Sequence, residues 1–91
     1  MAWRIVQQPN GLFARFSEVV DDFTHYDMTK EAAIECCREY LGRSDAEEKV
    51  QRGIDAGIVR FDEAISIVRM VHGGETAAER RRELSQEGGA S

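Results

Sequence analysis

Residues 3–16 read WRIVQQPNGLFARF, and this stretch predicts the β-hairpin on which the fold depends. At its centre, Pro9 presets φ for the first turn position, Asn10 tolerates the second, and Gly11 supplies a left-handed residue. This order is typical of a type I turn closed by a glycine bulge, which joins two antiparallel strands through a three-residue loop. The sequence therefore predicts strands at 3–8 and 12–20, in a register that pairs Val6 with Ala14 and Arg4 with Phe16.

The predicted hairpin carries apolar residues on both of its faces. One face would hold Val6, Leu12, Ala14 and Phe16, and the other Trp3, Ile5, Phe13 and Val19. A sheet with one solvated side should instead alternate between apolar and polar residues. Either helices cover one face and the second face contacts a partner, or the pairing register is shifted by one residue. We expect the second face to be used, in a homo-oligomer or against another protein.

The remainder of the chain predicts one more strand and a series of helices. Asp21-Asp22 indicates a turn, and residues 23–28 are rich in β-favouring side chains. Three helical patterns follow. The first is capped by Thr29 and runs to about Leu41, with Gly42 as the residue that ends it. The second opens with the capping box Ser44-Asp45-Ala46-Glu47 and ends at Gly57, and the third runs from about Phe61 to His72. The expected fold class is α+β, with an N-terminal antiparallel hairpin and a short third strand packed against two to three helices.

The last part of the chain differs in composition from the part before it. Residues 1–74 are expected to form a single α+β domain, whereas residues 75–91 carry an arginine triplet and little that is apolar and bulky besides Leu84. Without an apolar stripe, such a segment cannot offset its own ordering entropy. We therefore expect a polar tail, helical or disordered, that contributes little to folding.

Charge and cysteine usage exclude several classes of protein. Twelve lysines and arginines against 17 aspartates and glutamates give a net charge of −5, which excludes a uniformly basic nucleic-acid-binding surface. The adjacent Cys36 and Cys37 are unsuited to a structural disulfide, which favours a reducing compartment. Neither a signal peptide nor a stretch of transmembrane length is recognisable. We expect a cytoplasmic protein without membrane contacts.

Histidines and cysteines do not form a recognisable catalytic or metal motif. His25, His72, Cys36 and Cys37 lack the ligand spacing of a zinc site, and consecutive helical residues point about 100° apart. Cys37 is better explained as a core residue, with Cys36 near the rim of the core. No catalytic residue, metal ligand or cofactor is predicted.

Acidic and aromatic residues gather around the second and third predicted strands and form the candidate partner-binding site. Carboxylates in a turn often serve only to form the turn and to contact solvent. Alternatively, a pair of carboxylates could bind magnesium or act in catalysis. Aromatic side chains interleaved with charge are typical of binding hot spots. Replacing the carboxylates should leave the fold intact, because exposed charges rarely stabilise it. The predicted site consists of Trp3, Phe13, Glu18, Asp21, Asp22, His25, Tyr26 and Asp27.

Two resemblances extend this interpretation. The sequence from Trp3 to Gly11, followed by Ala14-Arg15-Phe16-Ser17 and Val20-Asp21-Asp22-Phe23-Thr24, resembles small accessory proteins encoded by bacteriophages and prophages over most of residues 3–75. A hairpin, a third strand and then Met28-Thr29-Lys30-Glu31-Ala32 at a helix start is similar in architecture to HicB-type antitoxins. The proline–glycine-rich segment expected before that strand is missing here.

The phage resemblance implies a protein that acts on host machinery inside a bacterial cell. Our first hypothesis is a non-enzymatic inhibitor of a bacterial defence system, such as a CRISPR effector, that works by protein–protein interaction. The second is an oligomeric sponge for a signalling nucleotide, with a tyrosine or tryptophan stacked on the base and Arg4, Arg15 or Arg60 near phosphate. The third is a small metal-dependent hydrolase that uses the carboxylates.

Overall fold

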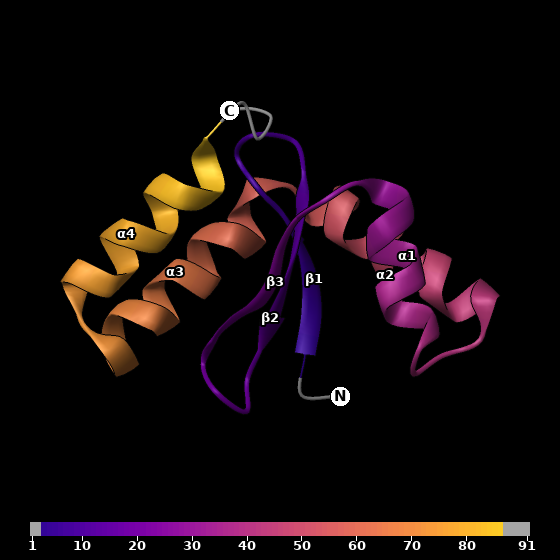
Figure 1. The fold of residues 1–91 in the computed structure, drawn as a ribbon, viewed down its shortest axis with the longest axis horizontal. Helices are drawn as coiled ribbons and strands as arrows, with labels where there is room; N and C mark the ends of the chain where they lie inside the picture. Colours follow the sequence, from indigo (N-terminus) through magenta and orange to yellow (C-terminus); the bar gives the residue numbers. More distant parts are fainter. Residues whose placement is uncertain (1–2, 87–91) are drawn as a thin grey trace.

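A computed structural model describes residues 3–86 and shows an antiparallel sheet between two pairs of helices (Figure 1). The α+β prediction is confirmed, with four helices where two to three were expected. No helix within the described residues has the length and apolar character needed to cross a membrane. The elements are β1 (Trp3–Gln7), β2 (Phe13–Ser17), β3 (Asp22–Met28), α1 (Lys30–Arg38), α2 (Arg43–Ala56), α3 (Ile58–His72) and α4 (Gly74–Ser85), and the strand order is β1-β2-β3.

The predicted hairpin forms in the predicted register. Val6 pairs with Ala14, and the loop is closed by a hydrogen bond from the Gly11 amide to the Gln8 carbonyl at 2.9 Å. Gly11 has a φ of 88°, the left-handed conformation that a glycine bulge needs. The second strand is shorter than predicted and ends at Ser17, because residues 18–21 form the turn into β3.

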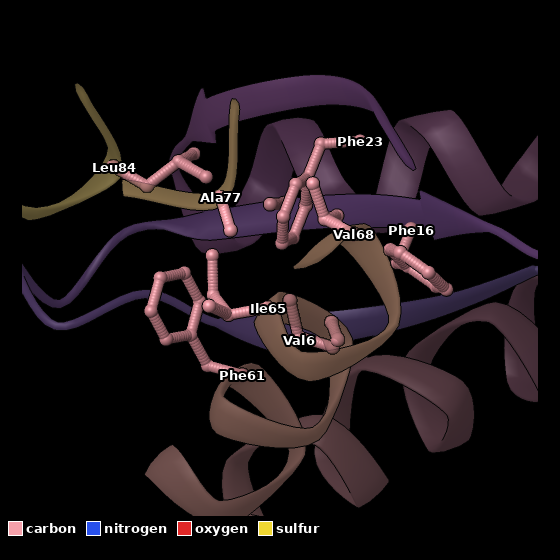
Figure 2. Close-up of a cluster of buried hydrophobic side chains, with 10 residues drawn as sticks. Val6, Phe16, Phe23, Phe61, Ile65, Val68, Ala77 and Leu84 are labelled. Carbon is pink, nitrogen blue, oxygen red and sulfur yellow. The ribbon is translucent and has the colours of Figure 1, made fainter. Parts of the chain in front are cut away.

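Helices cover both faces of the sheet, so the expectation of a free apolar face is wrong. Successive strand residues point to opposite faces. Val6, Ala14 and Phe16 of one predicted set lie in one core, and Trp3, Ile5 and Phe13 of the other set lie in a second core. The other two predicted residues lie in neither core, and Val19 is 77% exposed in the turn after β2. Figure 2 shows the core on the α3–α4 side, where strand residues meet both helices. The first core contains Val6, Ala14, Phe16, Phe23, Phe61, Ala64, Ile65, Val68, Ala77 and Leu84; the second contains Trp3, Ile5, Phe13, Ala33, Cys37, Ala46 and Val50.

The helix starts follow the sequence signals in part. Thr29 caps α1 as predicted, accepting a 3.1 Å hydrogen bond from the Ala32 amide. The predicted cap at Ser44 is wrong, because α2 already begins at Arg43 and Gly42 occupies the cap position. Gly42 therefore begins α2 and does not end α1.

The segment after Gly74 is a helix of the folded domain, which corrects the expectation of a tail that contributes little. Gly73, with a φ of 101°, turns the chain back so that α4 packs along α3 (Figure 1). Ala77 is fully buried and Leu84 is 1% exposed in the first core (Figure 2). The remainder of the predicted tail, residues 87–91, lies outside the described residues.

Strand β1 contacts both α2 and α3. A Cβ atom on Gly53 of α2 would lie 2.8 Å from the Ile5 carbonyl oxygen, so only glycine allows this helix to approach so closely. The Arg60 guanidinium reaches the same carbonyl oxygen at 3.4 Å. These contacts shield β1, which leaves β3 as the more exposed edge of the sheet.

The close approach at Gly53 reverses the usual effect of adding a methyl group to a helix. Helix propensity alone favours alanine over glycine by about 1 kcal/mol. We expect Gly53→Ala instead to lower the free energy of unfolding by about 1–3 kcal/mol, because the methyl group collides with backbone. Urea denaturation measures this change, and the exposed Gln51→Ala on the same helix is the control. A rise in stability for Gly53→Ala would refute the close packing.

Candidate functional site

Strand β3 presents an exposed run of four residues at the edge of the sheet. Thr24, His25, Tyr26 and Asp27 are all exposed, and half of the Tyr26 surface is accessible. The strand pairs only with β2 within the described sheet, so its outer backbone groups face away from other strands. Such an edge offers unpaired donors and acceptors to a further strand.

The pairing of β3 with β2 is irregular. Arg15 pairs with His25 and Phe16 with Phe23, so one extra β3 residue is accommodated between these pairs. A second irregularity separates the His25 pair from the one at Met28. Bulges of this kind bend an edge strand and re-aim its side chains, as they do beside many functional sites.

The predicted acidic cluster is divided between the two ends of β3. Asp27 lies near the β1–β2 turn, where its carboxylate accepts a 2.9 Å hydrogen bond from the side-chain Nε2 of Gln8. Glu18, Asp21 and Asp22 lie at the opposite end, in or next to the β2–β3 turn. Glu18 forms an ion pair with Arg4. The four carboxylates therefore do not make one continuous surface.

Asp22 has a structural role. Its two carboxylate oxygens accept hydrogen bonds from Nε and Nη2 of Arg80 in α4, at 3.0 and 3.1 Å. The Phe23 amide donates a further bond of 2.7 Å. Burial raises the pKa of Asp22, but the bonds from Arg80 and Phe23 outweigh it, and the net pKa is lowered. The expectation that all the turn carboxylates can be replaced without cost is wrong for Asp22.

The lowered pKa of Asp22 makes its contribution to stability pH-dependent. The contribution is complete above the pKa of an unfolded aspartate, about 4, and is lost as pH falls through the lower folded value. We expect Asp22→Asn to lower the free energy of unfolding by about 1–3 kcal/mol at pH 7. The loss should be smaller at low pH, where Asp22 of the wild type is itself protonated. Chemical denaturation at pH 7 and pH 3 measures this, with Asp21→Asn as control. An equal loss at both pH values would contradict the assignment.

Two of the predicted partner-binding residues lie inside the protein. Trp3 is 8% exposed and Phe13 is 5% exposed, and both pack in the core beneath α1 and α2. They do not belong to a free surface, because α1 and α2 cover the second face of the hairpin, which we had expected to contact a partner. Of the predicted set, His25, Tyr26 and Asp27 lie together on the exposed part of β3.

The structure also groups cations and aromatic rings into a cluster that the sequence did not predict as a group. The guanidinium carbon of Arg15 lies 4.9 Å from the Trp3 ring centre and 5.2 Å from that of Tyr40. The Lys49 ammonium lies 4.3 Å from the Trp3 ring centre. One signal was present: Arg15 is a charged residue between apolar neighbours, at a strand position whose side chain points toward the second core.

The cysteines lie where the sequence placed them. Cys37 is fully buried and Cys36 is at the rim of the core, and both are free thiols. Burial raises the pKa of Cys37 to about 11 and also raises that of Cys36, which disfavours the thiolate form of both. His72 contacts the Val20 carbonyl oxygen at 2.9 Å. Residues 3–86 contain no group of three or more histidine, cysteine, aspartate or glutamate side chains that could hold a metal ion.

Comparisons with known proteins identify no matching family model, no similar curated protein and no similar solved structure.

Proposed function

We propose that this protein is a non-enzymatic binding protein that captures an extended segment of another protein along the edge of β3. The observation that carries the proposal is the run of exposed residues from Thr24 to Asp27 on an edge strand, in a sheet whose faces are both covered. Following the phage resemblance, we propose a partner from a bacterial defence system, met in the cytoplasm of the host cell.

Strand addition fits the chemistry of this edge. Main-chain hydrogen bonds to the outer side of β3 would supply affinity for any extended peptide, and the flanking side chains would select among sequences. Tyr26 offers a half-exposed ring of the kind enriched at interface hot spots. The net charge of −5, with Asp27 on the edge itself, favours a segment that carries lysine or arginine.

Affinity capture from a bacterial lysate, followed by mass spectrometry, tests the proposal. The informative variant is His25→Lys with Tyr26→Lys, which removes the exposed ring and adds two positive charges to the edge. The matched control is Val59→Lys with Met70→Lys, which adds the same charge at exposed apolar positions of α3. Both double variants must show the circular dichroism of the wild type.

We expect a captured protein that the wild type and the α3 control retain and that the β3 variant loses. Light scattering separates this result from pairing of two copies of the chain through the same edge, which would make the protein a homo-oligomer. Equal capture by all three proteins, or by none, would contradict the proposal.

A further inference from the structure

Within the described residues, the Arg15 guanidinium lies against aromatic rings and beside the Cys36 thiol, and no oxygen atom accepts a hydrogen bond from it. It lies about 5 Å from the ring centres of both Trp3 and Tyr40, which are themselves 5.6 Å apart. Its Nε atom is buried and has no hydrogen-bond partner within residues 3–86. A guanidinium carries five donors and cannot lose its charge, so this arrangement leaves its hydrogen-bonding capacity largely unused.

Several positive charges lie around Lys49, and two of them, Arg4 and Arg52, are paired with Glu18 and Glu48. Lys49 lies against the same tryptophan ring, and no carboxylate lies within 4 Å of Lys49 or Arg15 among the described residues. Burial, together with Arg52, Arg60 and Arg4, lowers the pKa of Lys49, whereas Cys37 opposes that change. An anion placed here would relieve this repulsion.

Three of the four residues of the cluster are accessible to solvent. Arg15 and Lys49 are half-buried, and 56% of the Tyr40 surface is exposed. The two rings fix the guanidinium before any ligand arrives, so less side-chain entropy is lost on binding than for a free surface arginine.

We propose that the cluster of Trp3, Arg15, Tyr40 and Lys49 is a binding site for a phosphate group. The Nη donors of Arg15 bind the phosphate oxygens, Lys49 supplies additional positive charge, and the exposed ring of Tyr40 can stack on a base attached to that phosphate. This site is distinct from the β3 edge in its ligand and its chemistry. It requires no partner protein.

The single tryptophan of the chain lies in this cluster and reports directly on binding. The purified protein is titrated separately with inorganic phosphate and with adenosine monophosphate, at constant ionic strength set by sodium chloride. We expect a saturable change in Trp3 fluorescence and a shift of the Arg15 Nε–H signal in NMR spectra. Tighter binding of the nucleotide than of phosphate would place the base on Tyr40, and equal affinity would assign the site to phosphate alone.

Variants then distinguish specific binding at this site from nonspecific attraction of an anion to surface arginines. We expect Arg15→Gln to weaken binding about tenfold or more, because a charge-assisted contact is lost. Arg69→Gln, at an exposed arginine on α3, should leave it unchanged. If Arg15→Gln does not fold, two measurements still test the site. One is the shift of the Arg15 signal in the wild type, and the other is the affinity of Lys49→Gln, which we expect to be weaker than that of the wild type. An Arg15 signal that does not move at saturating ligand, or undiminished binding by folded Arg15→Gln, would overturn the proposal.

Discussion

Truncation after Gly73 is expected to abolish cooperative folding, although the removed segment is mostly polar. The deletion takes away Leu84, which is 1% exposed, and the fully buried Ala77, and it opens the core that they form with β1, β2, β3 and α3 (Figure 2). It also removes Arg80, leaving the partly buried Asp22 without its cation. Loss of one buried leucine costs about 2–5 kcal/mol, a large share of the 5–15 kcal/mol that stabilises a typical domain.

Circular dichroism during thermal unfolding measures the effect of the truncation. A milder version is Leu84→Ala, for which we expect a loss of about 3 kcal/mol. Met70→Ala is the control, because 82% of the Met70 surface is exposed and its replacement should change stability by less than about 0.5 kcal/mol. A truncated protein that unfolds cooperatively at the wild-type temperature would show that α4 is dispensable.

Gln8→Leu is expected to destabilise the fold by about 2–4 kcal/mol, because it removes hydrogen bonds without opening a large cavity. Gln8 is 2% exposed and connects three parts of the molecule. Its Nε2 group donates to the Leu84 carbonyl oxygen at 3.0 Å and to the Asp27 carboxylate at 2.9 Å. Its Oε1 atom accepts a 2.7 Å hydrogen bond from the Asp27 amide, where the chain has a φ of 58°.

The substitution leaves the Asp27 amide and the Leu84 carbonyl without these partners. We therefore expect both the positive-φ residue of β3 and the end of α4 to loosen together. Urea denaturation gives the stability, and NMR shifts of the two backbone groups show whether the loss is local. Gln7→Ala, at the neighbouring and less buried position, serves as control. Wild-type stability for Gln8→Leu would contradict this role.

The hairpin was predictable because its signals are local. Pro9, Asn10 and Gly11 specify the turn within three residues, and the period of two in the strands then fixes which side chains share a face. The sequence also showed that both faces are apolar. It could not show what covers them, because that depends on the direction in which each helix leaves its preceding turn.

The contributions of α4, Asp22 and Gln8 were not predictable for the same reason. Each depends on contacts between distant residues: Asp22 and Arg80 are 58 positions apart, and Gln8 and Leu84 are 76 apart. A single leucine and a small alanine are a weak signal for a packed helix, yet they suffice once Gly73 directs α4 onto α3. Likewise, Trp3 and Phe13 are residue types typical of binding hot spots, but their strand positions place them beneath α1 and α2.

The exposed β3 edge is the basis of the proposed function, and amide hydrogen exchange with and without the captured partner tests it most directly. In the free protein we expect amides of Thr24 to Tyr26 that face away from β2 to exchange faster than those of β1, which α2 and α3 cover. With the partner bound, exchange along β3 should slow at least tenfold while that of α3 and α4 stays unchanged. Protection that appears on the helices and leaves β3 unaffected would contradict recognition at this edge.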